Sequence, residues 1–213
     1  MGKLYYFYGT MNSAKSANLL TKAFQFKESN CEVIMLKPSF DTRDKGVIKS
    51  RAITTPQSCH VFDKNKDVFQ LVYSLLGQVM ANKRKIGKVV VFVDEVNFIT
   101  KEQVEQLWRL TRTPYDISVF AYGLKTTYQN TLFEASEQLL VLSDSITEIK
   151  SMCCKCNNKA TTHLRKIKDK YVFDGDECIV GDINGQDETY ESVCETCWYI
   201  EYDKENNENG SIN

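Results

Sequence analysis

Short apolar runs and longer amphipathic stretches alternate over the first 150 residues of the chain. The short runs predict strands at 3–8, 31–36, 88–93 and 117–122. The longer stretches carry apolar residues at helical spacing and predict helices at 16–27, 67–80 and 100–111. Strands separated by helices indicate βαβ crossovers. We therefore expect an α/β fold with a mostly parallel sheet, in which ligands bind at the carboxyl ends of the strands.

The pattern changes after about residue 150, where cysteine, glycine and polar residues dominate. This change predicts a main domain over 1–150 and a small second domain over 151–202. Residues 203–213 are acidic and amide-rich, and are expected to form a disordered tail. With 42% hydrophobic and 26% charged residues, the 213-residue chain has an ordinary globular composition, which excludes a fully disordered or fibrous protein.

The balance of charges bears on possible partners. The chain has 27 Lys and Arg residues against 28 Asp and Glu, so no overall positive field exists to hold a nucleic acid, and we expect no such partner.

The longest apolar run, 89–93, is far shorter than the roughly 20 residues that span a bilayer. The first residues also lack the order of a signal peptide. We expect a cytoplasmic protein with no membrane partner, in which the eight cysteines favour metal binding over disulfides.

A phosphate-binding motif follows the first predicted strand. The segment GTMNSAKS fits the pattern G-x-x-x-x-G-K-[ST] except that Ala14 stands in place of the second glycine. In such a loop, backbone N–H groups face the phosphates, Lys15 reaches the β and γ oxygens, and the Ser16 hydroxyl ligates Mg²⁺. A polar turn that merely opens a helix is the alternative interpretation. The candidate phosphate-binding residues are Gly9, Thr10, Met11, Asn12, Ser13, Ala14, Lys15 and Ser16.

Two carboxylates, Asp94 and Glu95, end the buried strand at 88–93. An acid at this edge can hold Mg²⁺, and its neighbour can deprotonate a nucleophile, which are the two tasks that phosphoryl transfer leaves to protein carboxylates. The alternative is that the pair only caps the helix that starts near Thr100.

Two C-x-x-C pairs, Cys153 with Cys156 and Cys194 with Cys197, suit a tetrahedral Zn²⁺ site. The intervening residues 157–193 are expected to contain a hairpin and a substantial loop. A redox C-x-x-C is the competing interpretation. It is disfavoured because there are two pairs and neither is expected to open a helix after a strand. Two further cysteines, Cys154 and Cys178, leave some ambiguity over which thiols bind the metal.

Some weaker candidates lie next to these motifs. Asp41 and Arg43 follow the second predicted strand, where an arginine could neutralise phosphate charge, although a D-T-R sequence is usually a solvated loop. Phe98, Tyr128 and Tyr190 lie in loop-like contexts where they could stack on a planar ring or simply pack in the core.

Together these motifs resemble those of the cytosolic (type II) thymidine kinase family over residues 3 to about 200. The first matching block looks most similar to those of enterobacterial and T-even phage members. The matching blocks are 8–20 (YGTMNSAKSANLL), 36–43 (LKPSFDTR), 93–98 (VDEVNF), 121–129 (AYGLKTTYQ) and 190–194 (YESVC).

The resemblance implies an α/β P-loop (RecA-like) domain with helices on both faces of the sheet, a small zinc-ribbon domain, and a homotetramer. It implies transfer of the γ-phosphoryl group of Mg²⁺-ATP to the 5′-hydroxyl of thymidine, giving dTMP for DNA synthesis by salvage. At the matching positions, Ser16 and Asp94 would serve Mg²⁺, Glu95 would take the proton of the 5′-hydroxyl, and Asp41 and Arg43 would flank the phosphates.

The resemblance also implies a base pocket between the two domains. Met11 would contact the thymine methyl group, and a loop between the two C-x-x-C pairs, the lasso, would bind the base mainly through its backbone. The other implied pocket residues are Phe98, Leu124, Tyr128, His163 and Tyr190, with Cys178, Ile179, Val180 and Gly181 from the lasso.

Several positions depart from the family pattern. If position 14 requires a positive φ, Ala14 costs of order 1 kcal/mol relative to glycine and weakens the phosphate cradle. Asn97 replaces a usual glutamine, the lasso is several residues longer, and His163 stands where a small or apolar side chain would approach the base. Neither His163 nor His60 has a partner at catalytic spacing, so neither is expected to be catalytic.

Three functional hypotheses follow. A thymidine kinase explains every motif at once. A zinc-ribbon nucleotide-binding module or sensor on a weakened P-loop domain is motivated by Ala14 and the altered lasso. A generic P-loop ATPase explains the loop and Asp94 but gives no role to Glu95 with Phe98 or to the lasso.

Overall fold

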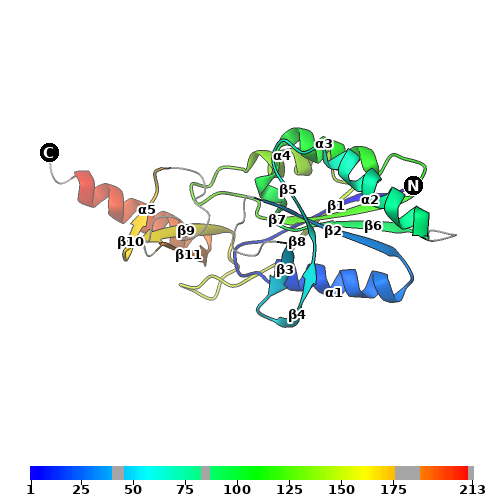
Figure 1. Ribbon diagram of the computed structural model, residues 1–213. Coiled ribbons are helices and arrows are strands. Elements are labelled where there is room, and N and C mark those ends of the chain that lie inside the picture. Colours follow the sequence, from blue (N-terminus) through cyan, green and yellow to red (C-terminus); the bar gives the residue numbers. More distant parts are fainter. Residues whose placement is uncertain (40–45, 83–86, 176–187, 211–213) are drawn as a thin grey trace.

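A six-stranded parallel sheet forms the centre of the main body in the computed structural model (Figure 1). The structure describes residues 1–39, 46–82, 87–175 and 188–210. The strand order is β5-β2-β6-β7-β1-β8, and every neighbouring pair is parallel, as the alternating pattern predicts. Its strands are β1 (Leu4–Tyr8), β2 (Glu32–Pro38), β5 (His60–Phe62), β6 (Val89–Val93), β7 (Ile117–Gly123) and β8 (Ser145–Glu148).

Helices cover both faces of this sheet, with α1 on one face and α2, α3 and α4 on the other (Figure 1). The central strands β6 and β7 are buried at every position because both of their faces are covered, which explains the continuous apolar run of β6. Helix α1 buries one stripe, which includes Leu19, Leu20 and Ala23. The helices are α1 (Lys15–Glu28), α2 (Val68–Asn82), α3 (Lys101–Leu110) and α4 (Glu134–Leu142), with a short 3₁₀ helix, η1 (Val96–Phe98).

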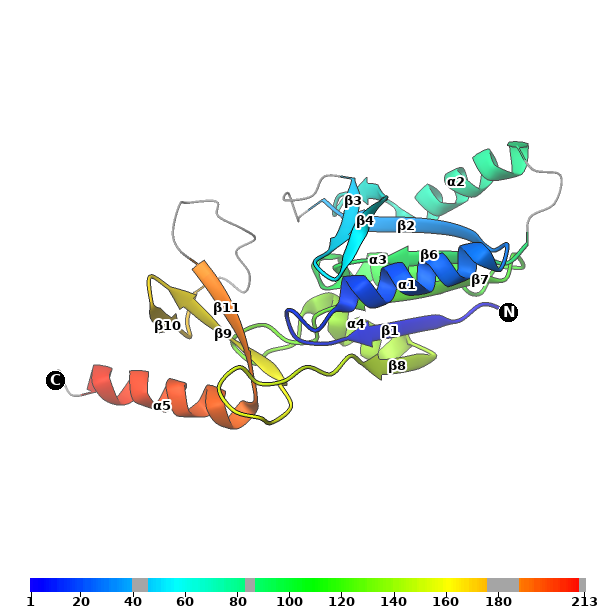
Figure 2. The ribbon, with the colours of Figure 1, turned by 90° about the horizontal axis from the view of Figure 1, so that it is seen from below.

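A second, antiparallel sheet of order β10-β9-β11 lies beyond the carboxyl ends of the main strands, and α5 extends away from it (Figure 2). Its central strand β9 pairs with β11 such that His163 lies directly opposite Ser192. Its elements are β9 (Thr162–Ile167), β10 (Lys170–Val172), β11 (Glu188–Val193) and α5 (Glu195–Gly210). A separate hairpin of β3 (Val47–Ser50) and β4 (Ile53–Ser58) contacts α1.

The C-terminal segment differs from the sequence prediction. A tail was expected from residue 203, whereas α5 continues to Gly210. The helix is held by an aromatic cluster, because Trp198 and Tyr202 stack one turn apart with ring centroids 5.1 Å apart and Phe173 packs edge-on against both rings. Division of the chain at residue 150 stays a prediction, although β8 ends at Glu148 and the next sheet is separate.

No helix among the described residues is both long enough and apolar enough to cross a membrane.

Candidate active site

The phosphate loop connects β1 to α1 in a backbone conformation that few residues adopt. Both Asn12 and Ala14 have a φ of 63°, in the left-handed region. Gly9 is required by space, because a Cβ atom there would lie 2.4 Å from the carbonyl oxygen of Ile149. Ala14 is also the residue before α1, and its side chain makes no capping hydrogen bond to the first N–H groups of the helix. Such a loop followed by a helix N-terminus can bind an anion.

The φ of Ala14 confirms that this position favours glycine. We predict that Ala14→Gly raises the free energy of unfolding by about 1 kcal/mol, because glycine adopts the left-handed region without steric cost. The same substitution at Ala17, inside α1, is expected to lower it by about 0.5–1 kcal/mol. Urea unfolding of both variants tests this, and equal effects at the two positions would contradict it.

Lys15 is buried and turns back onto the loop. Its Nζ donates to the carbonyl oxygens of Gly9 (3.2 Å) and Thr10 (2.7 Å). Burial lowers the pKa of Lys15, and the carboxylates of Glu95 and Asp94 partly oppose this shift. The ammonium group therefore lies at the mouth of the loop, held by weak acceptors that a phosphate can replace.

Ser16 and Asp94 are brought together from two elements that are far apart in the sequence. The Ser16 hydroxyl donates to the Asp94 carboxylate at 3.1 Å. Burial, followed by the charge of Glu95, raises the pKa of Asp94 to about 7, while Ser16, Lys37 and Lys15 lower it in part. A buried carboxylate and a hydroxyl are oxygen ligands of the kind that Mg²⁺ prefers, so these two residues fit a magnesium site.

Glu95 lies beside Asp94 at the carboxyl end of β6, with a left-handed φ of 52°. It does not cap α3. That helix begins after Thr100, whose side chain accepts from Gln103 in a complete capping box. The interpretation of Asp94 and Glu95 as a simple helix cap is therefore wrong, and the half-buried Glu95 remains available for chemistry.

The predicted pocket residues come from three segments. Phe98 ends η1 and packs edge-on against Phe133, beside an open depression of about 240 Å³ at the ends of β2 and β5. The ring of Tyr128 packs against Tyr190 with centroids 6.4 Å apart. Leu124, directly after β7, donates its N–H to Asn97 at 3.0 Å, so the shorter Asn97 still fixes this loop.

Two residues that sequence reasoning missed hold Tyr128 in place. Arg165, buried on β9, donates to the Tyr128 hydroxyl at 3.2 Å and pairs with Glu188 at 2.9 Å. The indole of Trp198 donates to the Tyr128 carbonyl at 2.9 Å. Because the partners are 37 and 70 residues away from Tyr128, no local spacing reveals them.

The structure places His163 against the phosphate loop. Its Nε2 accepts a hydrogen bond from the backbone N–H of Met11 at 2.8 Å. The remaining predicted site residues lie outside the described part of the chain: Asp41, Arg43, Cys178, Ile179, Val180 and Gly181.

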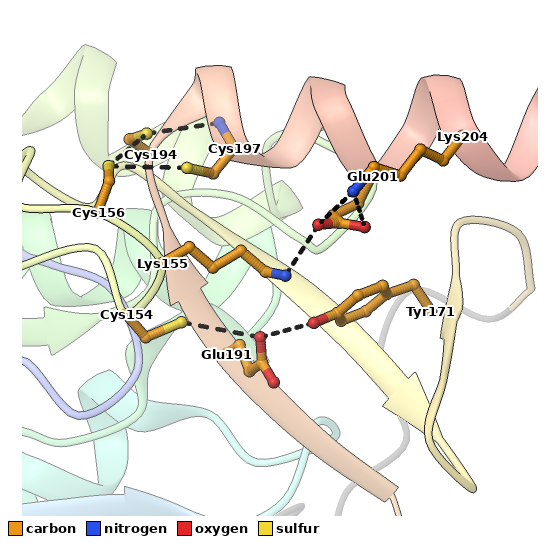
Figure 3. Close-up of polar contacts among 9 residues, drawn as sticks. All are labelled: Cys154, Lys155, Cys156, Tyr171, Glu191, Cys194, Cys197, Glu201 and Lys204. Carbon is orange, nitrogen blue, oxygen red and sulfur yellow. Dashed lines mark hydrogen bonds and ion pairs between the residues drawn. The ribbon is translucent and has the colours of Figure 1, made fainter.

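Four cysteine sulfurs gather between the second sheet and the start of α5, and three of them, those of Cys156, Cys194 and Cys197, are drawn in Figure 3. The Sγ atoms of Cys153, Cys156, Cys194 and Cys197 all lie within 4.8 Å of one another. Thiolates at about 2.3 Å from a tetrahedral Zn²⁺ are about 3.8 Å apart, so the cluster fits this ion. Burial alone would raise the pKa of Cys153, but backbone N–H groups and the Cys156 side chain bring it down to about 6. The hydrogen bond with Cys194 raises the pKa of Cys197, so without a metal the four thiols are not all ionised.

Cys154 lies outside this cluster. Its thiol is exposed and donates to Glu191 at 3.7 Å, which also accepts from the Tyr171 hydroxyl (Figure 3). The expectation that neither C-x-x-C pair opens a helix after a strand is wrong for the second pair, because Cys194 directly follows β11 and α5 begins at Glu195. The convergence of all four sulfurs nevertheless favours a metal site over a dithiol.

Comparison with known proteins decides the family. A family model described as thymidine kinase matches residues 2–198. The chain belongs to the thymidine kinase family. A thymidine kinase of Streptococcus agalactiae is 37% identical over 91% of this chain and 95% of its own length. One of Streptococcus thermophilus is 36% identical over 93% of this chain and 94% of its own.

The fold of this thymidine kinase family member has distant structural relatives. A DnaB-like replicative helicase superposes with a TM-score of 0.50 at 13% identity, over 89% of this chain and 54% of the helicase. Such a likeness shows the fold alone, and it agrees with the predicted P-loop architecture.

Family membership confirms the expected enzyme class, an ATP-dependent kinase. The alternative of a nucleotide sensor on a weakened loop is not favoured, because the relatives are kinases over nearly the whole chain.

Proposed function

We propose that this thymidine kinase transfers the γ-phosphoryl group of ATP to the 5′-hydroxyl of thymidine, giving dTMP and ADP. The observation that carries the proposal is the contact of Ser16 with Asp94 at 3.1 Å, which joins the phosphate loop to the end of β6 with Glu95 beside it. Phosphate binding, metal binding and a general base thus meet at one edge of the sheet, where ligands of parallel sheets bind.

The loop binds the ATP phosphates through its N–H groups and the N-terminus of α1. Lys15 exchanges its contacts with Gly9 and Thr10 for the β and γ oxygens of ATP. Ser16 and Asp94 hold Mg²⁺, which when bound neutralises charge on these oxygens. By the resemblance to the family, Asp41 and Arg43 would flank the phosphates.

Glu95 accepts the proton of the 5′-hydroxyl as its oxygen forms a bond to the γ-phosphorus. The bond between this phosphorus and the bridging β–γ oxygen breaks, and ADP leaves with the electron pair. Glu95 suits the role because it is adjacent to Asp94 and is less buried, so the hydroxyl can reach it.

The thymine ring lies between the main body and the second sheet. Tyr128 supports this placement, because it follows β7 of the main sheet and is anchored to β9 and α5 through Arg165 and Trp198. A closed pocket rejects a base whose polar edge it leaves unpaired. The residues proposed to enclose the base are Met11, Phe98, Leu124, Tyr128 and Tyr190, with Cys178, Ile179, Val180 and Gly181 of the lasso.

The four clustered cysteines hold a structural Zn²⁺ that fixes the second sheet to α5. We further propose that the protein acts as a homotetramer in the cytoplasm, supplying dTMP by salvage. These features are carried over from the family.

Phosphorylation of thymidine, deoxyuridine, deoxycytidine and deoxyadenosine by the purified protein with Mg²⁺-ATP tests the proposed function. We expect turnover of thymidine and none of deoxyadenosine. ATP hydrolysis at the same rate with and without nucleoside, or no turnover of any nucleoside, would contradict the proposal.

A further inference from the structure

Two side chains of the second sheet hold a single residue of the phosphate loop. His163 accepts from the Met11 N–H at 2.8 Å, and the Ser192 hydroxyl donates to the Met11 carbonyl at 2.7 Å. His163 and Ser192 are directly opposite each other on β9 and β11, so their side chains leave the same face of the sheet. We call these two hydrogen bonds the Met11 clasp.

The clasp acts on two successive peptide groups of the loop. The peptide group between Thr10 and Met11 contains the Met11 N–H and the Thr10 carbonyl. This carbonyl oxygen accepts hydrogen bonds from Lys15 at 2.7 Å and from the Ser13 N–H at 3.2 Å. The peptide group between Met11 and Asn12 contains the Met11 carbonyl, and Asn12 has a backbone φ in the left-handed region. Fixing both peptide planes therefore sets where the Thr10 carbonyl points and where the loop turns.

The environment of His163 suits an acceptor. The imidazole is only 3% exposed, and burial, followed by the charge of Lys15, lowers its pKa to about 3. A neutral imidazole has one free nitrogen lone pair, which here faces the Met11 N–H. A third contact, between the hydroxyls of Thr10 and Ser151 at 2.5 Å, lies next to the clasp.

We propose that His163 and Ser192 are positioning residues that hold the phosphate loop in its phosphate-binding conformation. The proposal rests on the proposed function, in which this loop binds the phosphates of ATP. It gives His163 a role beside the base-binding one expected from the sequence, because the accepting nitrogen of its imidazole is bonded to Met11. Nucleotide affinity therefore depends on a sheet that contributes no residue to the loop itself.

Titration of Mg²⁺-ADP into the nucleoside-free protein tests this directly. We expect His163→Leu to weaken ADP binding about 5- to 30-fold, because it leaves the Met11 N–H without its acceptor. His163→Gln offers a carbonyl oxygen near the position of Nε2 and is expected to restore most of the affinity. Ser192→Ala should weaken binding about 2- to 10-fold. Thr189→Ala, an exposed position on the same strand, is the matched control and should change nothing.

Steady-state kinetics provides a second readout. The clasp predicts that His163→Leu raises the KM for ATP more than it changes the ratio of thymidine to deoxyuridine turnover. Unchanged ADP affinity in folded His163→Leu and Ser192→Ala would overturn the proposal, and an altered base preference would then place His163 in the base pocket. If His163→Leu does not fold, Ser192→Ala alone decides. Wild-type protein that fails to bind ADP would instead contradict the proposed function.

Discussion

Glu95→Gln is expected to lower kcat for thymidine phosphorylation about 10²- to 10⁴-fold, the usual contribution of a general base. Glutamine keeps the size and the left-handed backbone site of Glu95 but cannot take the proton of the attacking hydroxyl. Because the loop and the pair of Ser16 with Asp94 are unaltered, ADP affinity should stay within about twofold of the wild type.

The matched control for this variant is Glu105→Gln, which removes an exposed carboxylate on α3. It should have wild-type kinetics. Full activity of Glu95→Gln, or a loss of ADP binding as large as the loss of kcat, would remove Glu95 from its proposed role.

Loss of the metal is expected to abolish thymidine turnover. Among the described residues, the buried apolar core of the second sheet consists of Leu164 and Val193 with Cys153 and Cys194, so two of these four residues are proposed metal ligands. A core this small does not hold a fold by itself, whereas structural zinc contributes on the order of 10 kcal/mol. Without zinc, the anchors of Tyr128 and the Met11 clasp are both lost.

Zinc analysis of the purified protein should therefore find about one ion per chain. Cys156→Ser is expected to lose zinc, to melt the second sheet and to be inactive. Cys154→Ser, which changes the adjacent exposed thiol, should keep both zinc and activity. A folded, active protein that contains no zinc would exclude the metal site.

The main sheet could be predicted from the sequence because its signals are local. The buried run of β6 and the stripe of α1 are each visible within a short window, and the phosphate motif lies at the junction of a strand and a helix. The left-handed Ala14 was anticipated conditionally, because the motif places a glycine there.

The elements that were missed lack such signals. Strand β4 is polar and contains Pro56, and β8 is a short edge strand that is mostly exposed. The packing of Phe173 against Trp198 and Tyr202 holds the first turns of α5, and the helix continues from there to Gly210 through polar residues, of which Lys204 pairs with Glu201.

The site was predicted only as far as its motifs are continuous in the chain. The Met11 clasp joins residues 152 and 181 positions apart, and one partner in each bond is a backbone group that has no sequence signature. The zinc ligands could be predicted because C-x-x-C spacing is itself a local feature.

The most direct test of the central claim follows the γ-phosphate. The protein is incubated with thymidine and with ATP labelled at the γ position. The amounts of labelled dTMP and of unlabelled ADP are then measured in the same sample. We expect equal amounts of the two products, both dependent on thymidine and both formed about 10²- to 10⁴-fold more slowly with Glu95→Gln. Formation of ADP with free labelled phosphate in place of labelled dTMP would contradict it, and would show an ATPase in which the phosphate loop and the carboxylate pair do not serve transfer to a nucleoside.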